Sequence, residues 1–287
     1  MTFSIVAWDP EPESGPEWGV AVASKFLAVG AVVPFAEVAA GAGATQALAN
    51  LSYAPDGLAR LRSGMGAAEV VRELVGADPE AAQRQLGIVD ASGRAAGFTG
   101  DDCFDWAGDV QGDGFSCQGY ILAGPQVLED MEAAFTSAGG DLAARLSAAL
   151  AAGDAAGGDR RGRQSAALFV VRRGAGYGGA SDVAVDLRVD DHPAPVDELR
   201  RLLELHRLLY PRPEELSFVP IDEALGAELR ELLAACGHPT KETGGYDREL
   251  RDALFAFSGT ENLEERWTED PAIEKEVLDY LRRKARP

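Results

Sequence analysis

The chain has 287 residues, of which 46% are hydrophobic and 26% charged, a composition that excludes a largely disordered protein. Its 47 acidic and 27 basic residues give a formal net charge of −20, which repels phosphate backbones and argues against nucleic acid as a partner. No apolar run reaches the roughly 18 residues of a membrane span, and the first residues lack a secretion signal, so we expect a cytoplasmic protein with no membrane partner.

The first region of the chain begins with two strand patterns. Residues 2–8 are rich in β-forming side chains, and residues 18–24 alternate small and apolar side chains. Residues 9–16, rich in proline and acidic residues, form the expected turn between them. A third apolar run covers residues 28–35, and small residues continue through 37–47, which favours close packing against another layer.

Pairs of helices alternate with further strands along the rest of this region. The expected helices cover residues 55–63, 67–76, 125–137, 141–152 and 195–209. The expected strands cover residues 85–90, 94–99, 165–172 and 183–189, the first two joined by the turn 91–93. Hairpin-linked strands favour antiparallel sheets, and paired helices must cover apolar sheet faces. The order predicts the α+β class, as a four-layer αββα sandwich, because a doubly wound parallel sheet would alternate strands and helices one by one.

The composition changes near residue 221. The 66 residues from Asp222 onward hold 16 acidic and 10 basic residues, a denser charge than before, and show only helical periodicity. Their leucine stripes predict three helices around a small core. Pro211 and Pro213 favour an extended path between the two regions. We therefore expect a domain over residues 1–210, a linker over 211–221 and a small helical module over 222–287.

Metals and cofactors are not expected. The three cysteines, Cys103, Cys117 and Cys236, are too few for a disulfide framework and lack metal-ligand spacing, and the three histidines form no ligand pair. The sequence also lacks a phosphate loop and the Gly-x-Ser-x-Gly and His-Glu-x-x-His motifs. No short motif decides the function on its own.

Thr2 is the first candidate for catalysis. It follows the initiator methionine and is a small residue of the kind that permits removal of Met1. The freed α-amine, with a pKa of about 7.7, would lie within reach of the Thr2 hydroxyl, so that one residue holds both nucleophile and base. Threonine is also common after Met1 without any catalytic role. The buried strand that Thr2 begins is the context that favours catalysis.

Lys25 and Asp9 are the expected catalytic partners of Thr2. Lys25 stands between apolar segments, and its ammonium would lower the pKa of a neighbouring amine and stabilise an oxyanion. Asp9, at the end of the first strand, would orient Lys25. The structural alternatives are an exposed lysine at a turn and an Asp-Pro turn.

Three polar clusters provide candidates for substrate binding. Residues 45–46 follow an apolar run and could face a cleft, and residues 118–120 precede a helix and could supply hydrogen-bond donors. Residues 159–165 concentrate three arginines, and guanidinium binds carboxylate bidentately. A solvated loop and an ordinary strand end are the structural alternatives. The expected substrate-binding residues are Thr45, Gln46, Gln118, Tyr120, Arg163, Gln164 and Ser165.

Several segments together resemble domain of unknown function 1028, a bacterial and archaeal family. The resemblance covers about residues 1–210. The segments that carry it are Thr2–Ala7, Gly19–Phe26, Ala44–Ala47, Gly157–Ser165 and Asp186–Pro193. It implies a sandwich like that of the N-terminal-nucleophile (Ntn) hydrolases, with Thr2 as the nucleophile. The tail is similar to a helical peptidoglycan-binding module attached to some members.

One position departs from the family pattern. The family tends to have Gln-Gly-Asn where this chain has Gln118-Gly119-Tyr120. If that asparagine donates to an oxyanion, the longer Tyr120 leaves the donor role open, and activity or specificity would differ here. The resemblance supplies no substrate.

Three functions are compatible with these features. The leading hypothesis is a hydrolase that cleaves an amide-like C–N bond of a small molecule or wall fragment through an acyl-enzyme, with Arg163 on a substrate carboxylate. The alternative is a non-catalytic binding protein for peptidoglycan fragments. The third makes the tail an oligomerisation or docking module on an inactive hydrolase fold, since the tail has few aromatic residues. Homo-oligomerisation is left open.

Overall fold

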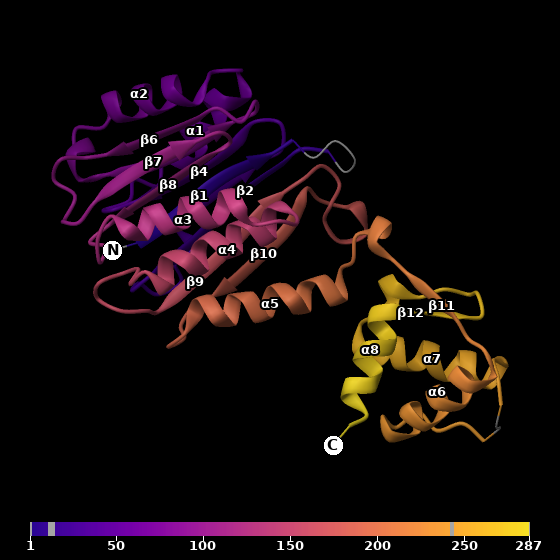
Figure 1. Cartoon of the computed structure of the whole chain (residues 1–287). Helices are drawn as coiled ribbons and strands as arrows, with labels where there is room; N and C mark the ends of the chain where they lie inside the picture. The colour runs from indigo at the N-terminus through magenta and orange to yellow at the C-terminus, as the bar shows by residue number, and fades with distance from the viewer. Residues whose placement is uncertain (1, 11–14, 242–243, 287) are drawn as a thin grey trace. The chain divides into compact units, whose positions relative to one another are not determined.

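The computed structural model describes residues 2–10, 15–241 and 244–286. These residues divide into two compact units between Leu202 and Leu203. The first unit contains two large β-sheets with their covering helices, and the second is mainly helical (Figure 1).

A six-stranded antiparallel sheet is the larger of the two in the described part of the first unit. Its order is β10-β9-β2-β1-β8-β7, with bounds Thr2–Asp9 for β1, Glu17–Ser24 for β2, Gly108–Gly112 for β7, Phe115–Tyr120 for β8, Ser165–Val171 for β9 and Val183–Val189 for β10. Every residue of β2 is buried. A strand covered on both faces needs small and apolar side chains throughout, which explains the composition of residues 18–24.

The second sheet has four antiparallel strands in the described residues. Its order is β3-β4-β5-β6, with bounds Pro34–Glu37, Gly41–Gln46, Gln85–Asp90 and Ala95–Thr99. The predicted turn 91–93 joins β5 to β6. Gly93 has a φ of +79° there, a left-handed value that glycine adopts without steric cost. A Cβ at Gly93 would also lie 2.0 Å from the ring of Trp8, so this turn requires glycine.

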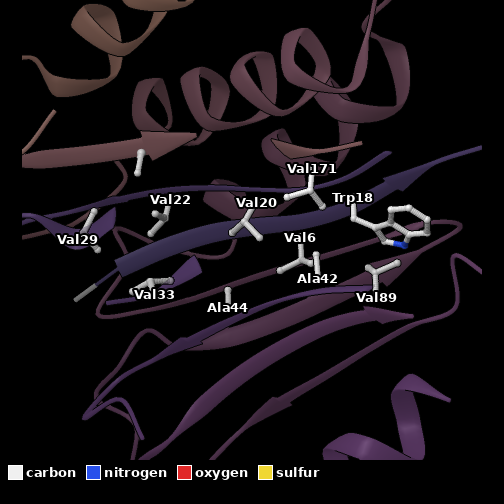
Figure 2. Packing of buried hydrophobic residues seen from close by; sticks show 11 residues of the cluster. Val6, Trp18, Val20, Val22, Val29, Val33, Ala42, Ala44, Val89 and Val171 are labelled. Carbon is white, nitrogen blue, oxygen red and sulfur yellow. The ribbon is translucent and has the colours of Figure 1, made fainter. Parts of the chain in front are cut away.

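The core between the two sheets consists mainly of valine and alanine (Figure 2). The buried cluster contains Val6, Trp18, Val20, Val22, Val29, Val33, Ala42, Ala44, Val89, Ala167 and Val171. Such short side chains let two sheets pack about 10 Å apart. Burying one valine side chain stabilises the fold by about 1.5–3 kcal/mol relative to leaving it in water.

Two pairs of helices cover the outer faces of the sheets (Figure 1). Their bounds are Tyr53–Arg62 for α1, Ala67–Ala77 for α2, Gln126–Ser137 for α3 and Leu142–Ala155 for α4. α1 and α2 pack on the smaller sheet through a cluster that includes Tyr53, Leu74 and Ile88. α4 packs on β1 and β2, and the Asp141 side chain caps it by accepting a hydrogen bond from the backbone of Ala144 (2.8 Å).

The second unit is a small helical module that also contains two short strands. Helix α5, Pro195–Leu209, crosses the division between the units. The elements after it are β11 (Phe218–Pro220), α6 (Glu223–Ala235), α7 (Arg248–Glu261), β12 (Ala272–Glu274) and α8 (Lys275–Lys284). Leucine side chains from the three helices after α5, such as Leu229, Leu254 and Leu281, form its core.

A buried ion pair ties the parts of this module together. Arg266 and Glu274 are 2.7 Å apart, with side chains 7% and 2% exposed. The Arg266 guanidinium also donates to the carbonyls of Arg207 and Leu208, and Glu274 accepts from the first backbone N–H groups of α8. Each charge is therefore compensated, as a buried charge must be.

The predicted class is confirmed in its broad form: the structure has mixed helices and antiparallel sheets followed by a helical region. Some elements were not predicted. β7 and β8 carry glutamine, glycine and serine in place of an apolar alternation. The run 28–35 contains a turn of 3₁₀ helix, Val29–Ala31, before β3. The prediction that only helices follow residue 221 is wrong, because β12 lies there and pairs with β11.

The organisation into a domain, a linker and a module stays a prediction, which limited proteolysis can test. Within the predicted linker 211–221, β11 is paired, whereas Pro213–Glu215 is exposed. A protease that cuts after glutamate should first cleave at Glu214 or Glu215 and leave a folded N-terminal fragment, identified by its mass. The double variant Glu214→Gln/Glu215→Gln should resist this cut. First cuts at Glu37 would contradict the two-part organisation.

Candidate functional site

Three strands of the six-stranded sheet bring their ends together at Thr2. β1 begins there, and β2 and β8 both end there because they run antiparallel to β1. Thr2 lies opposite Tyr120 of β8. On the other side, Phe3 lies opposite Ala23, so Ser24 is the residue of β2 that reaches Thr2. Strand pairing thus collects three hydroxyl groups that are far apart in the sequence.

The hydroxyl group of Thr2 is held by the other two. Its Oγ1 lies 3.0 Å from Oγ of Ser24, and its side chain is hydrogen-bonded to the phenol of Tyr120. Thr2 is only 5% exposed. Burial raises the pKa of Tyr120, while the hydrogen bond with Thr2 and the charge of Arg161 act in the opposite direction. The phenol is therefore protonated at neutral pH and can donate a hydrogen bond.

A buried network of amide side chains fixes the start of β1. Gln46 Nε2 donates to Oε1 of Gln85 (2.7 Å) and to the carbonyl of Thr2 (3.5 Å). Gln118 Nε2 donates to Oγ of Ser4 (2.7 Å), which donates to Oε1 of Gln46 (2.8 Å). The side chains of this network lie between the sheets with at most 1% exposure. A buried polar network with its hydrogen bonds made holds one arrangement of its strands, here the one that directs Thr2.

The loop between α4 and β9 covers the same end of the sheet. Asp159 anchors it, because Oδ2 accepts a hydrogen bond from the backbone of Lys25 (2.7 Å) and Oδ1 from the backbone of Arg161 (2.9 Å). The guanidinium of Arg161 pairs with the same carboxylate at 3.3 Å. Gly157 and Gly162 have φ of +109° and +112°, values that disfavour any side chain, and so they shape the loop. The arginines predicted as an anion site are thereby placed near Thr2.

A cavity of about 340 Å³ lies at this end of the sheet, a size that suits a small molecule. Ser24 contributes to its wall, but Thr2 does not, and the side chains of Phe3 and Ala23 line it from the face of the sheet that α4 covers. The apolar part of the wall is formed by Phe3, Ala23, Ala123 and Pro195. The charged part is formed by Asp154, Asp159, Arg160 and Arg163.

Exposed apolar side chains gather at the same end of the two sheets. They follow the last residues of β2, β4 and β6, all of which end on the side where β1 begins. These residues are Phe26, Leu27, Leu48, Leu51 and Phe104, which are 51–67% exposed. Exposed apolar side chains at one end of a domain are typical of a binding surface.

Comparison with known proteins assigns the chain to a family. The model of the family of unknown function (DUF1028) matches residues 2–199, which include Thr2, Ser24, Tyr120 and the arginine loop. The chain belongs to this family. A second family model, described as "Putative peptidoglycan binding domain", matches residues 208–281.

A crystal structure from the DUF1028 family is similar to this chain. It is protein SPO2555 from Silicibacter pomeroyi, with 33% sequence identity and a TM-score of 0.65, over 72% of this chain and 89% of that chain. No curated protein matches this chain. The comparisons therefore give family membership and fold and leave the reaction to be inferred from the site.

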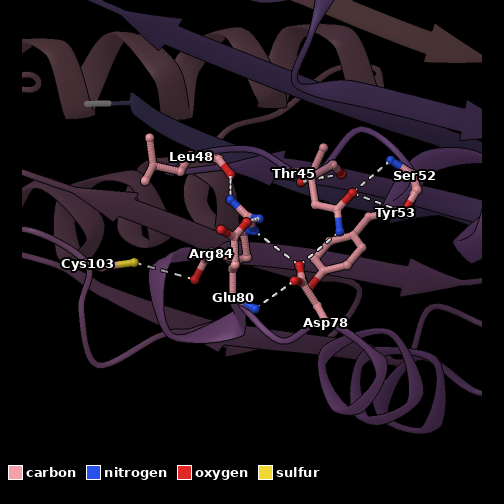
Figure 3. A network of polar contacts seen from close by, with 9 residues as sticks. Thr45, Leu48, Ser52, Tyr53, Asp78, Glu80, Arg84 and Cys103 are labelled. Carbon is pink, nitrogen blue, oxygen red and sulfur yellow. Dashed lines mark hydrogen bonds and ion pairs between the residues drawn. The ribbon is translucent and has the colours of Figure 1, made fainter.

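Two predicted site residues of this family member lie away from Thr2. Asp9 is at the opposite end of β1, where its carboxylate pairs with Arg145 (3.0 Å), so the prediction that it orients Lys25 is wrong. Thr45 points to the other face of β4 from Gln46, because side chains alternate along a strand. Its hydroxyl donates to a carbonyl of the loop after β4, beside the polar network centred on Asp78 (Figure 3). Thr45 therefore does not face the cavity.

Four predicted binding residues contact the protein itself. The buried amides of Gln46 and Gln118 belong to the network between the sheets. Ser165 Oγ donates to the carbonyl of Phe26 (2.5 Å), and Gln164 Nε2 donates to Asp191 (3.1 Å). Gln46, Gln118 and Ser165 are at most 1% exposed, which corrects the expectation that these three side chains bind substrate, while substrate binding by Gln164 stays a prediction.

Lys25 and Arg163 do lie at the Thr2 end, together with Tyr120. The Lys25 side chain is exposed, and its Nζ is 3.4 Å from the carbonyl of Arg163. Arg163 lines the cavity, but both oxygens of Asp154 accept hydrogen bonds from its Nε, at 2.7 and 3.0 Å. The catalytic role of Lys25 stays a prediction, and the guanidinium of Arg163 is already paired.

Four residues at this end of the sheets were not among the predicted site residues: Ser24, Asp159, Arg160 and Gln85. Ser24 could have been noted as a hydroxyl directly before Lys25, and Asp159 as an acid that opens a run of arginines. Gln85 gave no signal, because its amide donates to the carbonyl of Gly119, which lies in the other sheet and far along the chain. In the described ranges no group of His, Cys, Asp or Glu is placed to hold a metal ion. The helices in these ranges also include none long and apolar enough to cross a bilayer.

Proposed function

We propose that this protein is an Ntn-type hydrolase that uses Thr2 to cleave an amide-like C–N bond. The observation that supports this best is the placement of Thr2. It begins a buried central strand, and its hydroxyl lies 3.0 Å from that of Ser24 and is hydrogen-bonded to the phenol of Tyr120. Two antiparallel sheets packed between helices also fit the sandwich of such enzymes.

The proposed reaction starts with removal of Met1, which lies outside the described residues. The neutral α-amine of Thr2 then takes the hydroxyl proton as Oγ1 attacks the carbonyl carbon, and gives that proton to the leaving nitrogen as the C–N bond breaks. An ester links Thr2 to the acyl group. Water, deprotonated by the same amine, hydrolyses this ester and restores Thr2.

Tyr120 provides the proposed hydrogen bond to the oxyanion. Its pKa is raised by burial, so it keeps its proton, and it already contacts the Thr2 side chain. A protonated phenol can therefore do what an asparagine amide would do at this position in the family pattern. Lys25 would add electrostatic support from the same end of the sheet.

Mass spectrometry of the intact protein tests this function. Protein from the native host should lack Met1, and treatment with an amide-directed electrophile should add one label per chain, which peptide mapping should place on Thr2. Retention of Met1 would contradict the mechanism, because the amine would be blocked. A label on another residue would contradict Thr2 as the nucleophile.

The second candidate function is non-catalytic binding of peptidoglycan fragments by residues 208–281. The match of this segment to a peptidoglycan-binding model supports it. Phe255 is 54% exposed and packs edge-to-face with Trp267, with ring centroids 5.2 Å apart, which offers an aromatic surface to a sugar ring. In a titration with a muropeptide, Phe255→Ser should lose binding while Thr2→Ala retains it. No binding by the full chain would favour a docking role for this segment.

A further inference from the structure

We propose that the outer edge of β10, over residues 185–189, pairs with the same edge of a second copy of this chain and forms a two-fold dimer. β10 is the last strand of the six-stranded sheet in the described ranges, next to β9 (Figure 1). A dimer of this kind joins the larger sheets of two copies into one continuous sheet. The proposal concerns an interaction surface and does not depend on the reaction proposed at Thr2.

The backbone of this edge is open to another strand. Its pairing with β9 is regular from Val185, opposite Val170, to Val189, opposite Ala166. In an antiparallel pair, alternate residues turn their N–H and C=O groups away from the partner strand. In the described part of the chain, residues 185–189 make no hydrogen bond to any segment other than β9. The groups that point outward therefore form an edge on which a further strand can pair.

Two opposite charges lie on one face of this edge. Asp186 and Arg188 are two residues apart, so their side chains share a face of β10. Arg188 lies opposite Ala167, a residue of the core between the sheets, and its stem packs on Gly30, where an added Cβ would be 2.9 Å from Cδ of Arg188. Both charged side chains are exposed, and neither makes an ion pair or hydrogen bond with any residue that the structure describes. Both charges are therefore available to a partner.

The order of these charges is complementary to itself. In an antiparallel pair centred on Leu187, Asp186 lies directly opposite Arg188 of the partner subunit, and the two-fold axis repeats this contact. Side chains directly opposite each other have Cβ atoms about 4.5–5.5 Å apart, which suits an ion pair. Pairing centred on Asp186 or on Arg188 would instead put like charges opposite each other, so the charges also select the register.

The sign of the charges distinguishes this edge from one that is protected against pairing. Charged side chains on an edge strand prevent association when they repel the incoming strand. Here the charges of two copies attract each other in the register centred on Leu187. Leu187 itself is half-buried, whereas Val185 and Val189 on the same face are each 7% exposed. Pairing would cover the exposed part of Leu187 with Leu187 of the partner subunit, which adds an apolar contact to the two ion pairs.

Sedimentation equilibrium of the full-length protein tests the proposal. The wild type should show a mass that rises with concentration towards twice that of the chain. Asp186→Arg and Arg188→Asp each turn both cross-strand ion pairs into like-charge pairs, and each should raise the dissociation constant of the dimer by about tenfold or more. The double variant Asp186→Arg/Arg188→Asp puts opposite charges back across the axis and should dimerise about as tightly as the wild type.

Asp113→Arg is the matched control. It makes the same change of charge as Asp186→Arg, on an exposed turn between β7 and β8, at the opposite edge of the same sheet. This variant should dimerise as the wild type does. All variants should show the circular dichroism spectrum of the wild type, so that a lost dimer is not a lost fold.

Three outcomes would overturn the proposal. A wild type that stays monomeric at every concentration would exclude the dimer. A dimer that neither single reversal weakens, or that Asp113→Arg weakens as much, would place the interface elsewhere. A double variant that dimerises no better than the single variants would show that Asp186 and Arg188 do not lie opposite each other, and the pairing centred on Leu187 would be wrong.

Discussion

Replacing Thr2 with alanine is expected to abolish labelling by the amide-directed electrophile, with a rate at least about a thousandfold lower than that of the wild type. The variant removes the only hydroxyl that the mechanism uses as a nucleophile. Thr2→Ser should keep part of the rate, because it retains the hydroxyl and the α-amine. Ser24→Ala removes the contact at 3.0 Å that positions the hydroxyl and should lower the rate by about tenfold. The measurement is the time course of label incorporation by intact mass.

The control for this series is Thr45→Ala. Thr45 is also a buried threonine near the end of a strand, but its side chain points to the other face of β4 from Gln46, away from Thr2. Its variant should label at nearly the wild-type rate, and all variants should show the circular dichroism spectrum of the wild type. Labelling of Thr2→Ala at the wild-type rate would place the nucleophile elsewhere and favour the non-catalytic binding function.

Hydrophobic periodicity in the sequence was sufficient to predict most of the fold. β1, β2 and β5 are fully buried over most of their length, so their residues are apolar or small and the strands are recognisable locally. β8 was not recognisable in this way. Its inward side chains include Ser116 and Gln118. Ser116 donates a hydrogen bond to Oε1 of Gln118, and Gln118 Nε2 donates one to Ser4 of β1, which compensates their burial. Compensation of that kind depends on tertiary pairing, and a local pattern cannot report it.

Only those residues of the candidate site that can be recognised from their type and their position in the chain were predicted. Thr2 was recognised from its position in the chain and from a family resemblance. Gln46 and Gln118 were predicted to bind substrate, but both amides hydrogen-bond to the Ser4 hydroxyl, and Gln46 also donates to the carbonyl of Gln118 in the other sheet. The pairing of Arg163 with Asp154, at the end of α4, could not be predicted either. That contact is set by the shape of the loop, which the sequence does not reveal.

A second large effect is expected at Asp78, outside the proposed site. Its carboxylate, 5% exposed, accepts hydrogen bonds from the side chains of Asn50 (2.9 Å), Tyr53 (2.9 Å) and Arg84 (3.1 Å) (Figure 3). Arg84 in turn donates to the carbonyl of Leu48, in the loop that carries the exposed leucines. The hydrogen bonds of Asp78 and Arg84 therefore connect the loop after β4, helix α1 and the segment before β5.

Asp78→Ala is expected to lower the free energy of unfolding by about 3–5 kcal/mol, because it leaves the nearly buried charge of Arg84 without its main partner. Chemical denaturation at neutral pH measures this loss. Asp101→Ala removes an exposed carboxylate from the same unit and should change the stability by less than about 0.5 kcal/mol. A loss below about 1 kcal/mol for Asp78→Ala would contradict the central role of this carboxylate.

The pH dependence of this difference provides an independent test. Burial alone would raise the pKa of Asp78, but the hydrogen bonds from Asn50, the Glu80 backbone, Arg84 and Tyr53 outweigh it and hold the pKa well below its usual range. In the unfolded chain the same group has a pKa of about 3.9. The stabilisation is therefore fully present above about pH 5 and is lost as the pH falls through the folded-state pKa.

The difference in stability between wild type and Asp78→Ala should stay constant from pH 7 to about pH 5 and shrink below about pH 4. A difference that grows as the pH falls would show that Asp78 is protonated in the native protein and does not hold Arg84 as a carboxylate.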